Sequence, residues 1–379
     1  MPRLDRAIRD GRMAGSSRRS LGIALGLFVG MAAWTASPTS SLAATPSDCA
    51  PVNGVKFICG VTNVEDWAPV PGTQWVIGSN LAAAGKQGTL YLFDTKTDTA
   101  TAVEPNDIAV KPDKERYKDC PGVPDWKIFG PHGLDLTRGT GQQRTLYAVN
   151  HGGREGVEVF DVDLSKGKPA FTWVGCAVVP KHFWPDGVAS LPNGEIVVTS
   201  LWDPEDPHRL DKLSKGEVVG GLDTWSPEKG WVEVPGSKGL SGPNGVIASA
   251  DGKEIFVAVW SGKEVARLSY GKTPVDKKTV HTGFLTDNLR WGPDDHTIYV
   301  GGQATSVKQV LECFESQQVN CPKVPFQIDS MDPSTMKLNT LIKAGSHGEF
   351  GAGTGAIKVG DHLWVSSFRA DRIGIFPLK

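Results

Sequence analysis

The chain of 379 residues has almost no excess of either charge, because 40 Lys and Arg face 42 Asp and Glu. Without a basic excess, nothing favours nucleic-acid binding, which needs a basic patch or stripe. Beyond residue 44 no segment approaches 18 consecutive apolar residues, so we predict no stable membrane insertion of the mature protein. The spacings C-x-x-C and G-x-S-x-G are absent, so nothing indicates a zinc ribbon, a thioredoxin-type site or a serine nucleophile.

Glycine and proline, in contrast, are abundant. The chain has 45 Gly and 26 Pro, together about 19% of residues against an average of roughly 12%. Such a composition favours many short strands joined by turns over long helices. The apolar share of 39% and the 12 Trp are sufficient for a packed core, which excludes a globally disordered chain.

Residues 1–44 have the features of a signal peptide. An Arg pair at 18–19 precedes an uncharged stretch over residues 21–36, shorter than the ~20 residues that span a membrane. Ser41 and Ala43 then offer small side chains at the -3 and -1 positions of a cleavage site. We predict an exported protein, periplasmic or secreted. An uncleaved anchor is the alternative, and the Arg pair loosely resembles a twin-arginine signal, so the export route stays open.

All six cysteines lie beyond the predicted cleavage point. An even number in an oxidising compartment favours disulfides, although six cysteines allow 15 connectivities. Proximity along the chain favours pairing Cys49 with Cys59 and Cys313 with Cys321. By elimination, Cys120 then pairs with Cys176. Buried free thiols are the alternative.

A pattern recurs through the predicted mature chain. It begins with a small or polar residue, followed by Asn, Asp or His and usually by Gly. Two or three residues of alternating polarity, a turn and a run rich in β-forming residues then follow. Its copies lie at residues 64–79, 130–151, 184–200, 242–260, 286–302 and 353–367. Repeats of roughly 40–60 residues with three or four strands each are typical of propeller blades. We therefore predict that residues 45–379 form one all-β domain, a six-bladed β-propeller with a central metal site. A pair of β-sandwiches would not explain why the polar residue returns in every copy.

The recurring polar residue begins the first strand of each copy, which lines the central channel in a propeller. The equivalent positions are then Glu65, His132, Asp186, Asn244, Asn288 and Gly355. Carboxylate and amide oxygens without cysteine suit a hard cation, and calcium takes 6–8 oxygen ligands. The predicted ligands are Glu65, Asp186, Asn244, Asn288 and the neighbouring Asp287. The alternative is that the Asx-Gly pairs only form turns.

His132 and His151 form a second constellation. His132 lies on the predicted inner strand of its blade, and His151 ends the next strand, so a hairpin can bring the two rings together. Imidazole, with an unperturbed pKa near ~6.5, can take a proton from water near neutral pH. Four tryptophans near inner-strand positions either line a substrate site or belong to the core: Trp184, Trp202, Trp260 and Trp291.

These residues resemble the paraoxonase/arylesterase family, within the wider group of senescence-marker protein and gluconolactonase-like propellers. The likeness spans roughly residues 60–378. FGPHGLDL and LYAVNHGGREGVEVF are similar to the family's histidine-bearing hairpin, SGPNGVIASADGKEIFVAVWSGKEV to its Asn-Gly blade, and LTDNLRWGPDDHTIYVGG to its Asp-Asn blade.

The resemblance implies a six-bladed propeller with a catalytic calcium that hydrolyses lactones and aryl esters. Carried over by position, the calcium ligands are Glu65, Asp186, Asn244, Asp287 and Asn288, and the histidine dyad is His132 and His151.

Three features depart from the family. Asp186 stands where the family has Asn. Gly187 replaces an Asp that serves a second, structural calcium, so that ion is not implied here. The last cysteine is Cys321, 58 residues before the end of the chain, so the family's disulfide between the chain ends cannot form.

We therefore predict a calcium-dependent lactonase or arylesterase acting on a small-molecule lactone or ester. His132, oriented by His151, would activate water, and Asp287 is the alternative base. Two other functions stay open. One is a lyase or isomerase on the same metal ring, and the other is a non-enzymatic binding propeller.

Overall fold

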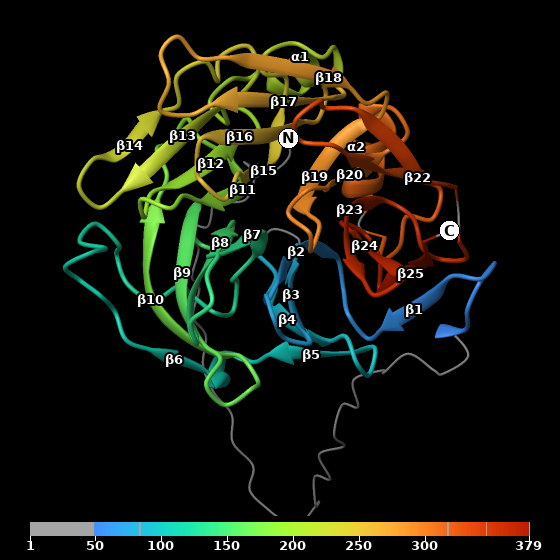
Figure 1. Cartoon of the computed structure of the whole chain (residues 1–379), viewed down its shortest axis with the longest axis horizontal. Helices are drawn as coiled ribbons and strands as arrows, with labels where there is room; N and C mark the ends of the chain where they lie inside the picture. Colours follow the sequence, from blue (N-terminus) through green and yellow to red (C-terminus); the bar gives the residue numbers. More distant parts are fainter. Residues whose placement is uncertain (1–48, 83–84, 317, 346, 379) are drawn as a thin grey trace, which may run out of the picture. The chain divides into compact units, whose positions relative to one another are not determined.

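The computed structural model of the chain describes residues 49–82, 85–316, 318–345 and 347–378, and the signal peptide predicted over residues 1–44 lies outside them. The described residues form six β-sheets that are arranged as blades around an axis (Figure 1). Successive inner strands contact one another around the whole ring. The predicted all-β, six-bladed propeller is confirmed.

Blades one to three follow the chain from the inside outward, with one strand added to blade two. Blade one contains β2 (Val64–Pro69), β3 (Trp75–Asn80), β4 (Leu90–Asp94) and β5 (Thr99–Val103). Blade two contains β7 (Pro131–Leu136), β8 (Gln143–Asn150), β9 (Gly156–Asp163), β10 (Ala170–Val178) and the short β6 (Ile108–Val110), which pairs parallel with β10. Blade three contains β11 (Pro185–Ser190), β12 (Ile196–Ser200), β13 (Gly221–Ser226) and β14 (Gly230–Glu233).

Blades four and five repeat the same order, and blade six combines the first described strand with the last three. Blade four contains β15 (Pro243–Ala248), β16 (Glu254–Val259), β17 (Glu264–Ser269) and β18 (Lys277–His281). Blade five contains β19 (Leu285–Trp291), β20 (Ile298–Gln303), β21 (Phe326–Met331) and β22 (Leu338–Ala344). Blade six contains β23 (Gly353–Val359), β24 (His362–Ser367), β25 (Arg372–Pro377) and β1 (Lys56–Cys59).

The pairing of β1 with β25 closes the ring. The two strands run antiparallel, from Lys56 opposite Ile375 to Cys59 opposite Arg372. Backbone hydrogen bonds between the first and last described strands therefore hold the propeller shut. The sequence has no cysteine near the chain end that could close the ring with a disulfide. The pairing of β1 with β25 closes the ring instead.

All three disulfides predicted from the spacing are present: Cys49–Cys59, Cys120–Cys176 and Cys313–Cys321. The first flanks β1, the strand that closes the ring. Three bridges fit the oxidising compartment that the sequence indicates.

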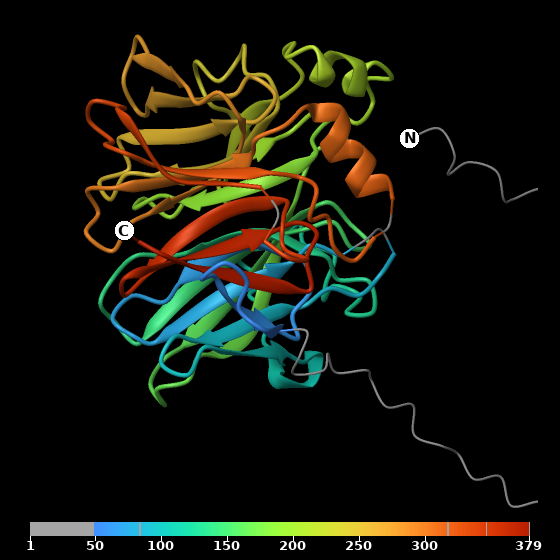
Figure 2. The same ribbon diagram turned by 90° about the vertical axis from the view of Figure 1, so that its right-hand side faces the viewer.

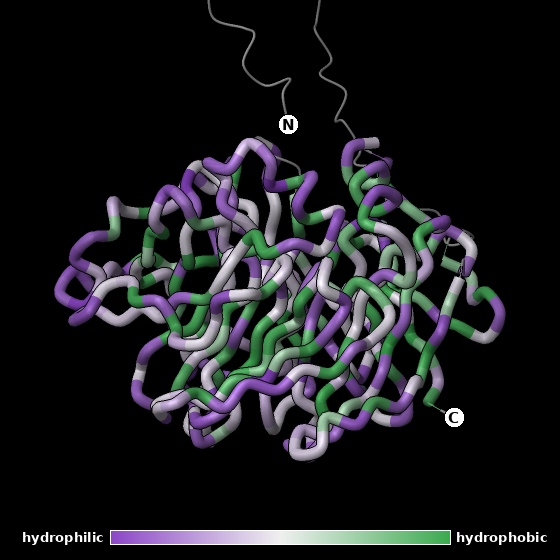
Figure 3. The backbone as a smooth tube through the Cα atoms, turned by 90° about the horizontal axis from the view of Figure 1, so that it is seen from above, coloured by the Kyte–Doolittle hydropathy of each residue, from purple (hydrophilic) through white to green (hydrophobic). Residues whose placement is uncertain are grey.

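The core lies between the blades. Each of the six interfaces between neighbouring sheets holds its own cluster of buried apolar side chains, and hydrophobic segments fill the interior in the view of Figure 3. Because both faces of a sheet are covered, the middle strands are apolar without alternation, as in Ile255–Val259. This explains why the second strands of the repeats read as continuous apolar runs.

Between the described strands lie two α-helices and a short 3-10 turn. Helices α1 (Arg209–Ser214) and α2 (Val307–Glu315) lie on the same side of the propeller (Figure 2), and η2 (Pro105–Asp107) precedes β6. The buried faces of α1 and α2 share one apolar cluster that contains Leu213 and Val310. Among the described residues, none of the helices has the length and apolar character needed to cross a membrane.

Candidate functional site

Every inner strand contains a β-bulge at the same place. In each blade, two consecutive residues of the inner strand lie opposite a single residue of the second strand. The six bulge pairs are Glu65-Asp66, His132-Gly133, Asp186-Gly187, Asn244-Gly245, Asp287-Asn288 and Thr354-Gly355. Bulges redirect side chains and are frequent beside active sites. The recurring polar position of the sequence is therefore a bulge within a strand, and not the Asx-Gly turn that was its alternative reading.

Local hydrogen bonds and close packing stabilise these bulges. The hydroxyl groups of Thr199 and Ser366, on the opposing strands, accept hydrogen bonds from the backbone N–H of Gly187 and Gly355. A Cβ atom at Gly187 would lie 2.7 Å from the carbonyl oxygen of Asn244 in the next blade. Glycine is needed at this position because neighbouring inner strands approach each other closely, a reason that involves no turn.

The structure changes the predicted register in blades five and six. Glu65, His132, Asp186 and Asn244 are the first residues of their bulges, as expected. In blade five the equivalent residue is Asp287, with Asn288 second, and in blade six it is Thr354 rather than Gly355. We call the six first residues the bulge ring: Glu65, His132, Asp186, Asn244, Asp287 and Thr354. All six are buried, with at most 8% of each residue exposed.

Direct contacts join members of the bulge ring across blades. The amide of Asn288 donates a hydrogen bond of 2.6 Å to Oε1 of Glu65, and Oε2 of Glu65 lies 3.2 Å from Nε2 of His132. The amide of Gln303 donates a bond of 2.5 Å to Oδ2 of Asp287. The indole of Trp260 in turn donates to Oε1 of Gln303 at 2.8 Å. Trp260 therefore supports the ring from behind.

The carboxylates of the bulge ring are crowded in a dry environment. Burial, and then the charge of Glu65, raise the pKa of Asp287 well above its usual value. Burial is also the main reason that the pKa of Asp186 rises to about 7. Burial alone would lower the pKa of His132, but the carboxylates of Glu65 and Asp186 outweigh it and raise that pKa to about 10. With all three acids ionised, the ring would carry negative charge that its one imidazole does not balance.

One oxygen atom of the ring, Oδ1 of Asn244, has no hydrogen-bond partner, and Oε2 of Glu65 has only its contact with Nε2 of His132. Unsatisfied buried polar atoms are rare and require an explanation. Across the described segments, no three His, Cys, Asp or Glu side chains form a group arranged for a metal ion. Donors of the bulge ring include amide oxygens, which suit calcium and are not ligands of the zinc type. The donor set and the orphaned amide oxygen of Asn244 therefore fit a hard cation, although no metal site is shown.

The predicted histidine pair forms, and the structure adds a third member. Nδ1 of His132 lies 2.9 Å from Nε2 of His151. Nδ1 of His151 lies 2.6 Å from Oε2 of Glu155, in the turn between β8 and β9. The sequence analysis missed Glu155. The signal that it offered was only its place four residues after His151, in a turn that must fold back toward the strand end.

Of the four tryptophans weighed in the sequence, Trp184 contacts a histidine and Trp202 contacts Trp184. The ring of Trp184 stacks on His151, with centroids 5.0 Å apart and planes inclined by 18°. Trp202 contacts Trp184 at 5.7 Å. Trp291 instead packs on Phe256 and donates to a backbone carbonyl. Trp184 and Trp202 thus form a partly exposed aromatic wall next to the dyad.

A second buried acid, Asp66, is paired within the protein. Its carboxylate contacts the guanidinium of Arg290 and accepts hydrogen bonds of 2.8 Å from the backbone N–H of Trp67 and Leu134. Arg290 also donates to the carbonyl oxygen of Leu134. We call Asp66, Arg290 and the main chain of Leu134 the Arg290 cluster. It links blades one, two and five.

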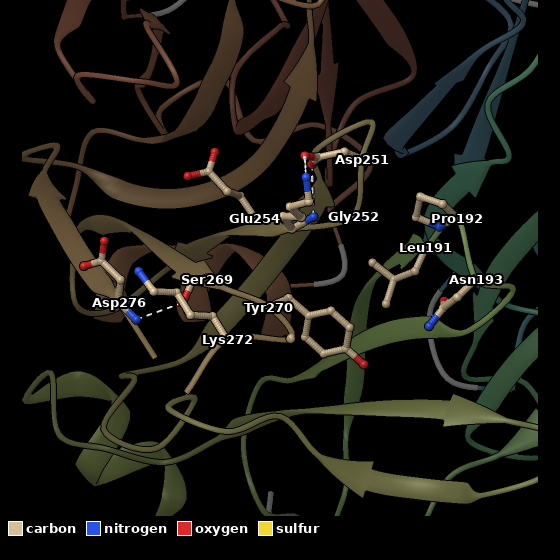
Figure 4. A pocket seen from close by; sticks show the side chains of 12 residues that line it. Leu191, Pro192, Asn193, Asp251, Gly252, Glu254, Ser269, Tyr270, Lys272 and Asp276 are labelled. Atoms are coloured by element: carbon tan, nitrogen blue, oxygen red, sulfur yellow. Dashed lines mark hydrogen bonds and ion pairs between the residues drawn. The ribbon is translucent and has the colours of Figure 1, made fainter. Parts of the chain in front are cut away.

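A pocket of about 700 Å³ lies away from these groups, between the outer turns of blades three and four. Figure 4 shows Tyr270 with Leu191 and Pro192 along its wall. The loop that begins at Leu191 follows the far end of β11, roughly 16 Å along the strand from Asp186. No residue of the bulge ring lines the pocket. The pocket is therefore separate from the candidate site, which is the ring.

No protein-family model and no curated protein sequence matches this chain. Solved structures with partial similarity include a "putative 6-phosphogluconolactonase" of Bacteroides fragilis, with 15% identity over 81% of this chain and 78% of that one, and a TM-score of 0.42. A luciferin-regenerating enzyme has 12% identity over 87% and 96%, with a TM-score of 0.49. A chain of the nidogen–laminin complex has 11% identity over 74% and 80%, with a TM-score of 0.42.

Similarity at this level carries no argument about what the chain does. Neither do the comparisons show the paraoxonase family. What the structure itself establishes is a six-bladed β-propeller whose inner bulges bring together acids, amides and a pair of histidines.

Proposed function

We propose that this protein is an exported, calcium-dependent hydrolase of lactones or aryl esters. The observation that carries the proposal is the bulge ring, in which three buried carboxyl groups and an unpartnered amide oxygen lie beside a pair of imidazoles. Charges of one sign are not buried together unless a counter-charge offsets them. The three disulfides support export to an oxidising compartment, the periplasm or the cell exterior.

The residues proposed to hold calcium are the five predicted from the sequence: Glu65, Asp186, Asn244, Asp287 and Asn288. Their oxygen donors suit the ion. The bond from Asn288 to Glu65 uses the amide N–H, so the amide oxygen of Asn288 is the atom assigned to the ion. When bound, calcium would polarise the substrate carbonyl and offset the carboxylate charge that raises the pKa of His132.

His132 is the proposed base. Its Nε2 atom faces the carboxylate of Glu65, on the side where the acids converge. With its pKa at about 10, His132 is protonated at neutral pH, so it takes a proton from water only when the charge around it is reduced. Asp287 is the alternative base, but Gln303 already donates to one of its oxygens. His151 holds the other nitrogen of His132.

The substrate is proposed to be a small ester with an apolar part. Trp184 and Trp202 are the apolar surface next to His151, and rings of this kind stack on planar groups and keep water away. This favours aryl esters and aromatic lactones over short aliphatic ones.

A substrate panel tests the proposal. Purified protein is assayed with aryl esters, aromatic lactones and aliphatic lactones, each with added calcium and with a calcium chelator. We expect hydrolysis that the chelator abolishes and calcium restores. Product analysis separates hydrolysis from elimination or isomerisation. Protein that carries calcium but turns over none of these compounds would exclude the proposed activity.

A further inference from the structure

Glu155 is the outer end of a chain of four side chains that begins at the propeller axis. Glu65 contacts His132 at 3.2 Å, His132 contacts His151 at 2.9 Å, and His151 contacts Glu155 at 2.6 Å. Only the last contact is made by a residue outside the bulge ring and the predicted dyad. Its short length indicates a hydrogen bond assisted by the charge of a carboxylate.

Exposure increases along this chain. The side chains of Glu65, His132, His151 and Glu155 are 2%, 10%, 15% and 31% exposed. Glu155 is therefore the member that water reaches most easily. The ring of His151 is also held from the side by Trp184, which stacks on it. Stacking on Trp184 fixes the plane of the His151 ring, and the contacts with His132 and Glu155 fix its rotation.

The hydrogen-bond partners determine which nitrogen of His151 carries a proton. Burial is the main cause that lowers the pKa of His151, so the ring is neutral at neutral pH and carries one N–H. An ionised carboxylate accepts hydrogen bonds only. Nδ1 of His151, which faces Glu155, must then hold the proton, and Nε2 accepts from Nδ1–H of His132. In this arrangement Nε2 is the nitrogen of His132 that exchanges protons on the side of Glu65.

We propose that Glu155 is a positioning residue that fixes the tautomer of His151 and, through it, that of His132. The expected effect of Glu155 on kcat rests on the proposed function, whereas its effect on the tautomer of His151 does not. Once His132 has lost its extra proton and become neutral, a His151 ring without Glu155 is free to present Nε2–H to His132. The unprotonated nitrogen of His132 would then be Nδ1, on the side away from the acids, and no base would face the substrate.

Nuclear magnetic resonance of calcium-saturated protein with 15N-labelled histidine tests the tautomer directly, because the bound ion offsets the carboxylate charge that keeps His132 protonated. The variant His151→Gln identifies the signals of His151. In the wild type we expect Nδ1 of His151 to be protonated and Nε2 to be unprotonated. In Glu155→Leu we expect both nitrogens to report a mixture of tautomers. A wild-type ring protonated at Nε2, or an unchanged His151 spectrum in Glu155→Leu, would overturn the proposal.

Kinetics supply the second readout. Losing a carboxylate that orients a functional histidine typically costs about 10–100-fold in activity, so Glu155→Leu should lower kcat by that factor and leave KM nearly unchanged. Glu155→Gln keeps an acceptor oxygen at the same reach and should fall between the wild type and Glu155→Leu. The control Glu228→Leu changes an exposed glutamate in the turn between β13 and β14 and should retain full kcat.

The two readouts separate this inference from the proposed function. If the wild type hydrolyses none of the esters or lactones, the function is wrong, while the spectrum of His151 still decides the role of Glu155. If the wild type is active and Glu155→Leu keeps its kcat, Glu155 has no positioning role and the hydrolase proposal is unaffected.

Discussion

The bulge ring and the Arg290 cluster are two groups of buried acids built from the same inner strands, and they balance charge differently. In the Arg290 cluster, Asp66 contacts a guanidinium and two backbone N–H groups. In the bulge ring, Glu65, Asp186 and Asp287 share only His132 as a basic group. Both Asp66 and Glu65 belong to one bulge, so a single residue step along β2 separates the two environments.

The difference indicates which cluster is structural and which is a binding site. Burial raises the pKa of both Asp66 and Asp186, but the charge that opposes burial is the permanent one of Arg290 at Asp66 and the titratable one of His132 at Asp186. An acid that the protein pairs with its own cation needs nothing from outside. Three acids that share one imidazole, beside the orphaned amide oxygen of Asn244, favour an added cation. We therefore assign a packing role to the Arg290 cluster and a ligand role to the bulge ring.

The largest effect is expected from removal of the only basic side chain of the bulge ring. His132→Gln should lower ester or lactone turnover by ~10²–10⁴-fold, as for loss of a general base, while calcium still binds. His151→Gln should cause a smaller loss, because His151 acts through His132. Steady-state kinetics and calcium binding measure both effects.

The matched control is His296→Gln, which changes an exposed histidine in the turn between β19 and β20 and should not alter turnover. Full activity in His132→Gln, or a larger loss in His151→Gln, would contradict the assignment of His132 as the base. Asp287 would then be the leading candidate.

The next effect concerns the Arg290 cluster. Arg290→Met leaves the buried carboxyl of Asp66 without its partner, and breaking a buried pair typically costs about 3–5 kcal/mol of unfolding free energy. Chemical denaturation measures this loss. The double variant Asp66→Asn with Arg290→Met should regain part of it, because no unpaired charge is left.

Removing a charged side chain from the bulge ring should not lower the stability of the metal-free protein, in contrast to Arg290→Met. Asp186→Asn removes an acid from a crowded group, so in the presence of a chelator it should not destabilise the protein. In saturating calcium it should destabilise, because a ligand is lost. Equal destabilisation in Arg290→Met and in metal-free Asp186→Asn would remove the distinction between the two clusters.

Much of this arrangement could be predicted from the sequence. Four of the six bulges leave a repeated mark, because the close approach of neighbouring strands demands glycine after the polar residue, as at Gly187. The register in blades five and six could not be predicted. A bulge places two residues opposite one partner, and in Asp287-Asn288 both residues are polar, so the sequence does not show which of them comes first. The contact between Arg290 and Asp66 joins residues 224 positions apart. No local pattern encodes it.

The smallest effect is a pH dependence of stability that calcium modifies. The pKa of Asp186 rises from 3.8 to about 7 and that of His132 from 6.5 to about 10 in the folded protein. Both raised values mean that the folded state binds more protons, so their contribution to stability is lost as pH rises through the folded pKa values. In a chelator, the Tm should fall between about pH 5 and pH 9.

Calcium should oppose this trend, because the ion binds ionised carboxylates and its affinity increases as they lose protons. The gain in Tm on adding calcium is therefore expected to be larger at the high end of this range than at the low end. A Tm that rises with pH in the chelator would show that the acids of the bulge ring are not strained by their shared burial.

The amount of calcium bound per chain tests the central claim most directly. Purified protein is dialysed against calcium and then analysed for metal content and by titration calorimetry, together with the double variant Glu65→Gln, Asp287→Asn. We predict one calcium ion per wild-type chain, bound in the bulge ring, and none in the double variant. A wild-type chain that binds no calcium, or a double variant that binds it equally well, would contradict the account.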